Sequence, residues 1–145
     1  MKAAEITQQI ESTGVVAIIR ASGSEELIDV VNALREGGLT CIEVTMTTPN
    51  ALDVIARARK QVGETAAIGV GTVLDAETAR AAIMAGAQFV VAPILDPRTI
   101  ETCSRYSVPV IPGAFTPTEI VRAWQAGADF VKIFPTSSVG ARYIR

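Results

Sequence analysis

The sequence predicts an α/β protein of the (β/α)₈ barrel type, of which these 145 residues supply about the first six β/α units. Apolar, β-branched runs alternate with helical stretches and begin near residues 15, 40, 66, 88, 108 and 129. The runs are continuously apolar, as in parallel strands that are covered on both faces. The phrase AGA precedes an apolar run twice, at 85–87 and 126–128. Strict alternation of this kind indicates a parallel sheet covered by helices.

Each expected element has local signals. The strands are VVAIIR (15–20), TCIEVTM (40–46), AAIGVGT (66–72), QFVVAP (88–93), VPVIPG (108–113) and DFVKIFP (129–135). The helices between them are bounded by residues that commonly start or end helices. In chain order these are Ser24 with Gly37-Gly38, Pro49-Asn50 with an end near Val62, Asp75 with Ala85-Gly86-Ala87, Asp96-Pro97, and Thr116-Pro117 with Ala126-Gly127-Ala128. Glu119 stands where a capping box requires an acidic residue.

An open, doubly wound sheet is the alternative architecture. The stretch GVGT (69–72) lacks the third glycine of a dinucleotide-binding fingerprint, which weakens the nucleotide-binding form of that fold. We therefore expect one barrel domain over residues 1–145, with two open sheet edges in place of its last two β/α units. The final residues, ARYIR (141–145), resemble the opening of a sixth helix.

The composition excludes several classes of function. Net charge is −2 and no basic stripe is present, so no nucleic-acid partner is expected. No apolar run approaches the roughly 18 residues of a membrane span, and the polar N-terminus favours a cytoplasmic location. The chain has no histidine, and Cys41 and Cys103 lack metal-ligand spacing, so we expect two buried thiols and no metal.

Polar side chains gather at the predicted carboxyl ends of the strands, where parallel β/α proteins place their chemistry. Arg20 ends the first strand, Glu43 and Thr45 the second and Thr72 the third. Lys132, one of three lysines in the chain, lies within the last strand between apolar neighbours. If the sheet closes, these groups converge on one mouth.

Lys132 has a chemical interpretation and a plainer one. Burial disfavours the ammonium form, and a neutral amine adds to a ketone to give a Schiff base. Glu43 is then the carboxylate for proton transfer, and Arg20 with the threonine hydroxyls suits a substrate carboxylate. Taken singly, a strand lysine is more often an edge residue or half of a salt bridge, and Glu43 more often the partner of a cation. Their common location favours the chemical interpretation.

Six segments of the sequence, in order, resemble those of a known family. They are IIR (18–20), IEVTMTTPN (42–50), GVGTV (69–73), FVVAP (89–93), PVIPGAFTPTE (109–119) and AGADFVKIFP (126–135). Together they resemble the bacterial aldolases of 2-keto-3-deoxy-6-phosphogluconate (KDPG) and 4-hydroxy-2-oxoglutarate (KHG). That family consists of class I aldolases on (β/α)₈ barrels, generally trimers, that need no cofactor.

The resemblance also implies roles for residues. Lys132 is implied as the imine-forming lysine and Glu43 as the proton shuttle, while Thr72, Pro93 and Phe134 line the pyruvate end. A 2-keto acid is therefore the expected substrate and a homotrimer the expected assembly.

Two departures from the family pattern bear on substrate. Many members of the family carry an arginine that contacts the substrate at the position of Thr47. The relative that acts on the galactonate isomer lacks that arginine, as this chain does. The last two β/α units, which hold the substrate phosphate, are not among these residues. The rival functions are thus a galactonate-specific aldolase and an inactive barrel fragment that serves as an assembly subunit.

Overall fold

The structure, a computed structural model, describes residues 1–20 and 26–144. Its helices are α1 (Ala3–Thr13), α2 (Glu26–Glu36), α3 (Ala51–Val62), α4 (Ala76–Met84), α5 (Pro97–Arg105), α6 (Pro117–Gln125) and the 3₁₀ helix η1 (Ala141–Ile144). Its strands are β1 (Ala17–Ile19), β2 (Cys41–Thr45), β3 (Ala67–Gly71), β4 (Val90–Val91), β5 (Val110–Ile111), β6 (Gly113–Ala114) and β7 (Lys132–Ile133). The predicted helix start at Ser24 lies outside the described residues.

All strand pairs are parallel, in the order β1-β2-β3-β4-β5, followed by β6-β7. β5 and β6 are two halves of one extended stretch separated by Pro112, which has no N–H to donate. The first half pairs with β4 and the second with β7, and the Lys132 N–H donates to the Pro112 carbonyl at 2.9 Å. The six predicted strands are therefore all present in chain order.

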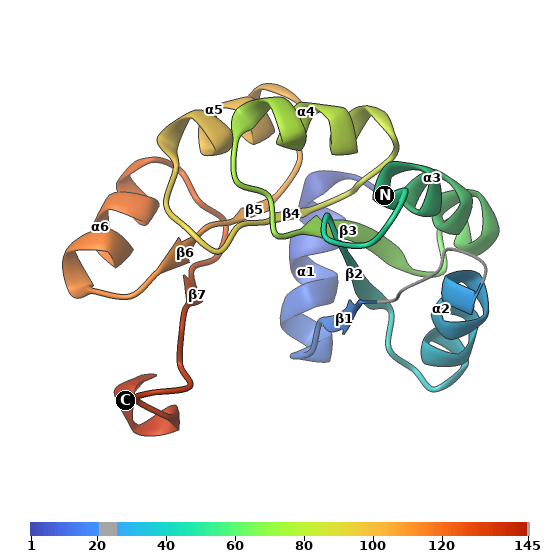
Figure 1. Ribbon diagram of the computed structural model, residues 1–145, viewed down its shortest axis with the longest axis horizontal. Coiled ribbons are helices and arrows are strands. Elements are labelled where there is room, and N and C mark those ends of the chain that lie inside the picture. Colours follow the sequence, from blue (N-terminus) through green and yellow to red (C-terminus); the bar gives the residue numbers. More distant parts are fainter. Residues whose placement is uncertain (21–25, 145) are drawn as a thin grey trace.

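The sheet curves, and its two faces have different covers (Figure 1). Helices α2 to α6 lie along the convex side. The larger apolar core fills the space between these helices and the sheet, and it includes Ile42, Val44, Ile68, Val70 and Val90. Side chains alternate between the two faces along a strand, so the strand residues that lie between these core residues in the sequence face the concave side.

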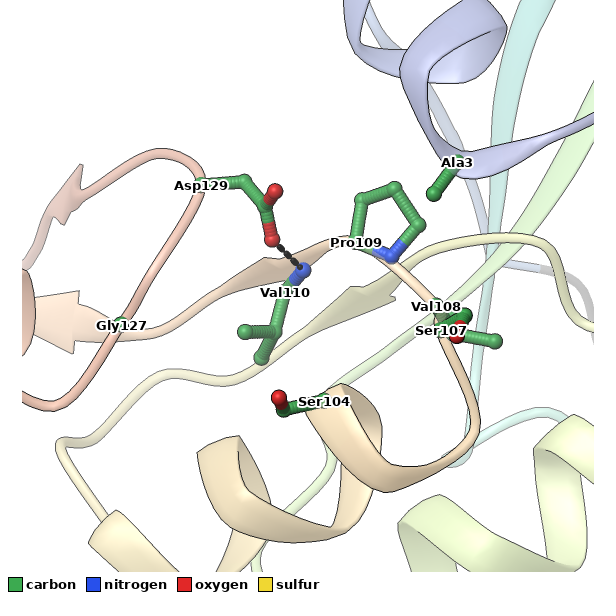
Figure 2. Close-up of a pocket in the computed structure, with 8 residues that line it drawn as sticks. All are labelled: Ala3, Ser104, Ser107, Val108, Pro109, Val110, Gly127 and Asp129. Atoms are coloured by element: carbon green, nitrogen blue, oxygen red, sulfur yellow. Dashed lines mark hydrogen bonds between the residues drawn. The ribbon is translucent and has the colours of Figure 1, made fainter.

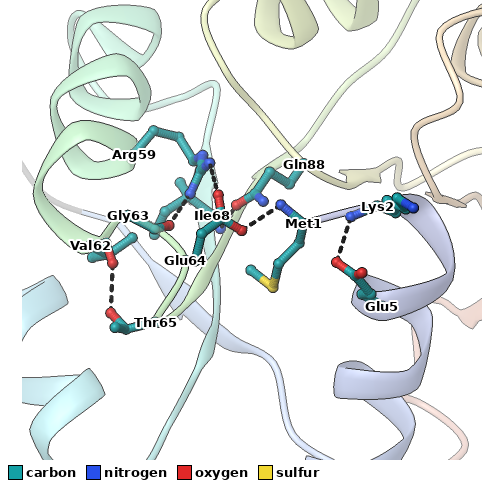
Figure 3. A network of polar contacts seen from close by, with 10 residues as sticks. All are labelled: Met1, Lys2, Glu5, Arg59, Val62, Gly63, Glu64, Thr65, Ile68 and Gln88. Carbon is teal, nitrogen blue, oxygen red and sulfur yellow. Dashed lines mark hydrogen bonds and ion pairs between the residues drawn. The ribbon is translucent and has the colours of Figure 1, made fainter.

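Helix α1 covers the concave side and was not predicted from the sequence. Its Ile6 and Ile10 pack on Cys41, Ala67 and Phe89 in a second, smaller core. Figure 3 shows that its start is held at the amino-terminal side of the sheet, where the Met1 ammonium contacts the Glu64 carboxylate at 2.5 Å. The other end of the concave face therefore remains uncovered by α1.

The predicted caps of α4 and α6 are confirmed. The Asp75 carboxylate accepts from the Thr78 N–H at 2.6 Å at the start of α4. At α6, Thr116 and Glu119 form the predicted capping box, in which Glu119 accepts from the N–H groups of Phe115 and Thr116 at 2.8 Å. Backbone hydrogen bonds lower the pKa of the Glu119 carboxyl.

The sheet has two open edges within residues 1–20 and 26–144. There, β1 pairs only with β2, and β7 pairs only with β6. No helix of this described part is long and apolar enough to cross a membrane.

Candidate active site

Glu43 is the buried acidic group at the centre of the site. It occupies the middle of β2, in register with Gly69 of β3. Because side chains alternate along a strand, its side chain faces the concave side of the sheet. The residue is only 3% exposed. Burial raises the pKa of its carboxyl, and the positive charges of Lys132 and then Arg20 lower it in part. Lys132 and Arg20 therefore lie close enough to act on this carboxyl, as the sequence predicted.

Lys132 lies on β7 in register with Gly113, and its Nζ stands 5.0 Å from the centre of the Phe134 ring. Phe134 is two residues further along the chain, so the two side chains share one face of the extended backbone. The residue is half-buried, whereas the sequence predicted an amine fully enclosed away from water. The reason is that β7 has a pairing partner on one side only within the described residues.

The threonines at the end of β2 form a hydroxyl cluster. Thr45 is fully buried, and its Oγ1 lies 2.9 Å from that of Thr47 and 3.5 Å from that of Thr48. Thr45 shares the parity of Glu43, whereas Thr47 is exposed at the end of the cluster. These hydroxyls can donate to a substrate oxygen at this end of the strand.

Thr72, Pro93 and Phe134 occupy the ends of neighbouring strands. Thr72 directly follows β3 with a φ of 60°, a left-handed conformation that is strained for a β-branched residue. Pro93 and Phe134 line one cavity of about 550 Å³ together with Gly113 and Phe115. The structure brings Pro93 and Phe134 together, and it gives no contact that joins Thr72 to them.

A second cavity, of about 180 Å³, lies at the opposite ends of the strands (Figure 2). Ser104, Ser107 and Asp129 line it, and the Val110 N–H donates to the Asp129 carboxylate at 2.9 Å. Chemistry in parallel β/α folds belongs to the carboxyl ends of the strands, so this cavity has no part in the site.

The described residues hold no group of three His, Cys, Asp or Glu side chains arranged as a metal site. Both cysteines are buried and free, as predicted, and burial raises the pKa of the Cys103 thiol to about 12. A thiol of that pKa is protonated at neutral pH and is a poor nucleophile.

One feature of the site was missed at the level of sequence. A Cβ atom added to Gly71 would lie 1.6 Å from Oε1 of Glu43, so the carboxyl occupies the space that a side chain there would fill. The signal in the sequence is the glycine pair in GVGT, which residue types alone do not connect to the carboxyl of Glu43.

The sequence matches the family described as "Aldolase: KDPG and KHG aldolase" over residues 6–145. This chain belongs to that family. The family comprises class I aldolases, which are lyases. The match confirms the predicted resemblance to this family.

Individual relatives agree with the family match. The chain is 38% identical over 135 residues to 2-dehydro-3-deoxy-phosphogluconate aldolase of Treponema pallidum, covering 93% of this chain and 64% of the relative. A structure described as native KDPGal superposes with a TM-score of 0.85 at 34% identity, over 89% of this chain and 63% of that one.

A structure of the KDPG aldolase of Legionella pneumophila, with pyruvate captured at low pH as a covalent carbinolamine, superposes with a TM-score of 0.82 at 25% identity. The superposition covers 89% of this chain and 63% of that one. The parallel α/β fold thus aligns with barrel aldolases, and the chain spans a little under two thirds of the length of these relatives.

Proposed function

We propose that this chain carries the imine chemistry of a pyruvate-releasing class I aldolase, with Lys132 as nucleophile and Glu43 as acid and base. The observation that carries the proposal is the buried carboxyl of Glu43 under the electrostatic influence of Lys132. A carboxyl whose pKa is raised titrates nearer to neutral pH, where a group can both accept and donate protons. The covalent pyruvate adduct of the Legionella relative supports the same chemistry here.

The reaction follows from these two groups. The neutral amine of Lys132 adds to the C2 ketone of a 2-keto-3-deoxy acid, and loss of water gives a protonated imine. Glu43, directly or through a water molecule, accepts the proton of the C4 hydroxyl, and the C3–C4 bond breaks. Its electron pair moves into the imine to form an enamine, and the aldehyde leaves. Protonation of the enamine at C3 and hydrolysis then release pyruvate and free Lys132.

Arg20, Thr45 and Thr47 bind the substrate carboxylate and hydroxyls in this proposal, and Thr72, Pro93 and Phe134 line the pyruvate end. The substrate is KDPG, which gives pyruvate and glyceraldehyde 3-phosphate, or KHG, which gives pyruvate and glyoxylate. Thr47, in place of the arginine of many members, favours the galactonate isomer as the alternative substrate. No cofactor takes part, and the assembly proposed is a homotrimer.

Exchange of the methyl protons of pyruvate with deuterium tests the chemistry without a phosphate-binding site. It requires only the imine and a base, and proton NMR follows it. We expect exchange in the unaltered chain and its loss in Lys132→Ala and Glu43→Gln. Lys60→Ala changes an exposed lysine of α3 and should leave exchange intact.

Exchange that survives Lys132→Ala would refute the proposal. An oligomer that shows no exchange at all would favour the assembly-subunit alternative. Release of pyruvate from KDPG, KHG and the galactonate isomer, measured side by side, would rank the substrates.

A further inference from the structure

The concave face of β3 carries no side chain larger than a methyl group. Ala67, Gly69 and Gly71 face this side, because they are in register with Cys41, Glu43 and Thr45 of β2. The side chain of Glu43 extends over this bare strand from one neighbouring strand, and the ring of Phe89 extends over it from the other side.

The space above Gly71 is filled by one group. A Cβ atom at this position would lie 1.6 Å from Oε1, 2.3 Å from Cδ and 2.7 Å from Cγ of Glu43. Non-bonded heavy atoms normally rest about 3.5–4.0 Å apart, so the carboxyl cannot keep its place beside any side chain. Gly71 lies in a regular strand and is not among the residues with positive φ. The glycine is therefore required by the position of the carboxyl and not by the backbone.

We propose that Gly71 is a positioning residue for the proton transfer, since its missing side chain is what admits the Glu43 carboxyl to the buried face of the sheet beside Lys132. The proposal rests on the function proposed above. It explains how an acidic side chain in a fully buried strand reaches the same side as the nucleophile. It also distinguishes Gly71 from Gly69, which has a different neighbour.

Gly69 provides a matched control on the same strand and the same face. A Cβ atom at Gly69 would lie 2.3–2.4 Å from three atoms of the Phe89 ring and is not placed against the carboxyl. Alanine at either position overpacks the concave face, so both variants lose stability. Only Gly71→Ala should move the carboxyl.

The test combines two measurements on Gly71→Ala, Gly69→Ala and the double variant Gly71→Ala/Glu43→Ala. The first is the pKa of the Glu43 carboxyl from ¹³C NMR, with the signal identified by its absence in Glu43→Gln. The second is the pyruvate methyl exchange rate, with borohydride trapping of the Lys132 imine as the reference for binding. Tm is recorded for each variant.

In Gly71→Ala we expect the carboxyl to be displaced toward water, so its pKa falls toward the ordinary value. Exchange should slow by about a hundredfold, as a misplacement of about 1 Å can produce, while the imine is still trapped. In Gly69→Ala the pKa should stay raised. Alanine at position 43 removes Cγ, Cδ and both carboxyl oxygens, which are the atoms that the added methyl group would meet, so the double variant should regain Tm relative to Gly71→Ala. Its exchange should stay lost, because the base is gone.

Three results would overturn the proposal. One is a Glu43 pKa and an exchange rate that Gly71→Ala leaves unchanged. Another is an equal loss of exchange in Gly69→Ala, which would show a purely structural effect. If Gly71→Ala does not fold, a double variant that is equally unfolded would show that the clash is not with Glu43. Should the unaltered chain show no exchange, the proposed function fails, yet the titration of Glu43 still decides the role of Gly71.

Discussion

Glutamine at position 43 is predicted to stabilise the fold at neutral pH and to lose that advantage in acid. The change removes an ionisable group from a site that is 3% exposed while keeping nearly the same shape. Burial raises the pKa of the Glu43 carboxyl, and the charges of Lys132 and Arg20 offset only part of that effect. The folded protein therefore holds the proton of Glu43 more tightly than the unfolded chain does.

The sign and scale follow from proton linkage. Below the ordinary pKa of 4.5 the carboxyl is protonated in both states, and stability does not depend on its titration. As pH rises above that value the unfolded chain loses the proton first, so the free energy of unfolding falls until pH passes the raised pKa of the folded state. Each unit by which the pKa is raised corresponds to about 1.4 kcal/mol.

Urea unfolding of both proteins from about pH 2 to pH 8 measures this difference in the free energy of unfolding. Glu119→Gln is the control of opposite sign, because hydrogen bonds lower the pKa of Glu119, and its contribution to stability is present above 4.5 and lost as pH falls below that value. The assignment of a buried carboxyl with a raised pKa would be refuted by either of two results. One is a difference in the free energy of unfolding between the unaltered chain and Glu43→Gln that stays constant with pH. The other is a difference that increasingly favours the unaltered chain as pH rises.

Three further changes test other parts of the site. Thr72→Gly removes a β-branched side chain from a left-handed backbone position, so it should raise the free energy of unfolding by about 1 kcal/mol in urea. It should also weaken pyruvate binding, as measured by imine trapping. A lower stability of this variant would contradict the strain. Phe89→Ala empties a fully buried ring position beneath the site and should cost about 3–5 kcal/mol; a cost under about 1 kcal/mol would show that the concave core is not packed on it. Arg20→Gln removes a charge that lowers the Glu43 pKa, so that pKa should rise further in the ¹³C titration; an unchanged value would place Arg20 too far away to act.

The strands and most helices could be predicted because their signals are local. Apolar β-branched runs gave the six strands, and residues such as Asp75 and Thr116 gave the helix starts. Helix α1 was missed because its buried residues are only Ile6 and Ile10, a stripe too thin to stand out from a polar segment. Its role in covering the concave face depends on the curvature of the whole sheet.

The proximity of the charged groups could be predicted because parallel strands end at the same edge of a sheet. Glu43, Lys132 and Arg20 were expected at one mouth on that ground, and Lys132 and Arg20 both lower the pKa of the Glu43 carboxyl. The half-buried state of Lys132 could not be predicted, because it depends on which neighbours the last strand has. The part played by Gly71 depends on a distance between strands, which residue types alone do not give.

The central claim is that Lys132 forms an imine with a 2-keto acid, and reduction with borohydride in the presence of pyruvate tests it most directly. Peptide mapping by mass spectrometry should find the reduced adduct on Lys132, and not on Lys2 or Lys60, and Lys132→Ala should abolish it. A chain that gains no adduct, or one modified equally at all three lysines, would contradict the claim.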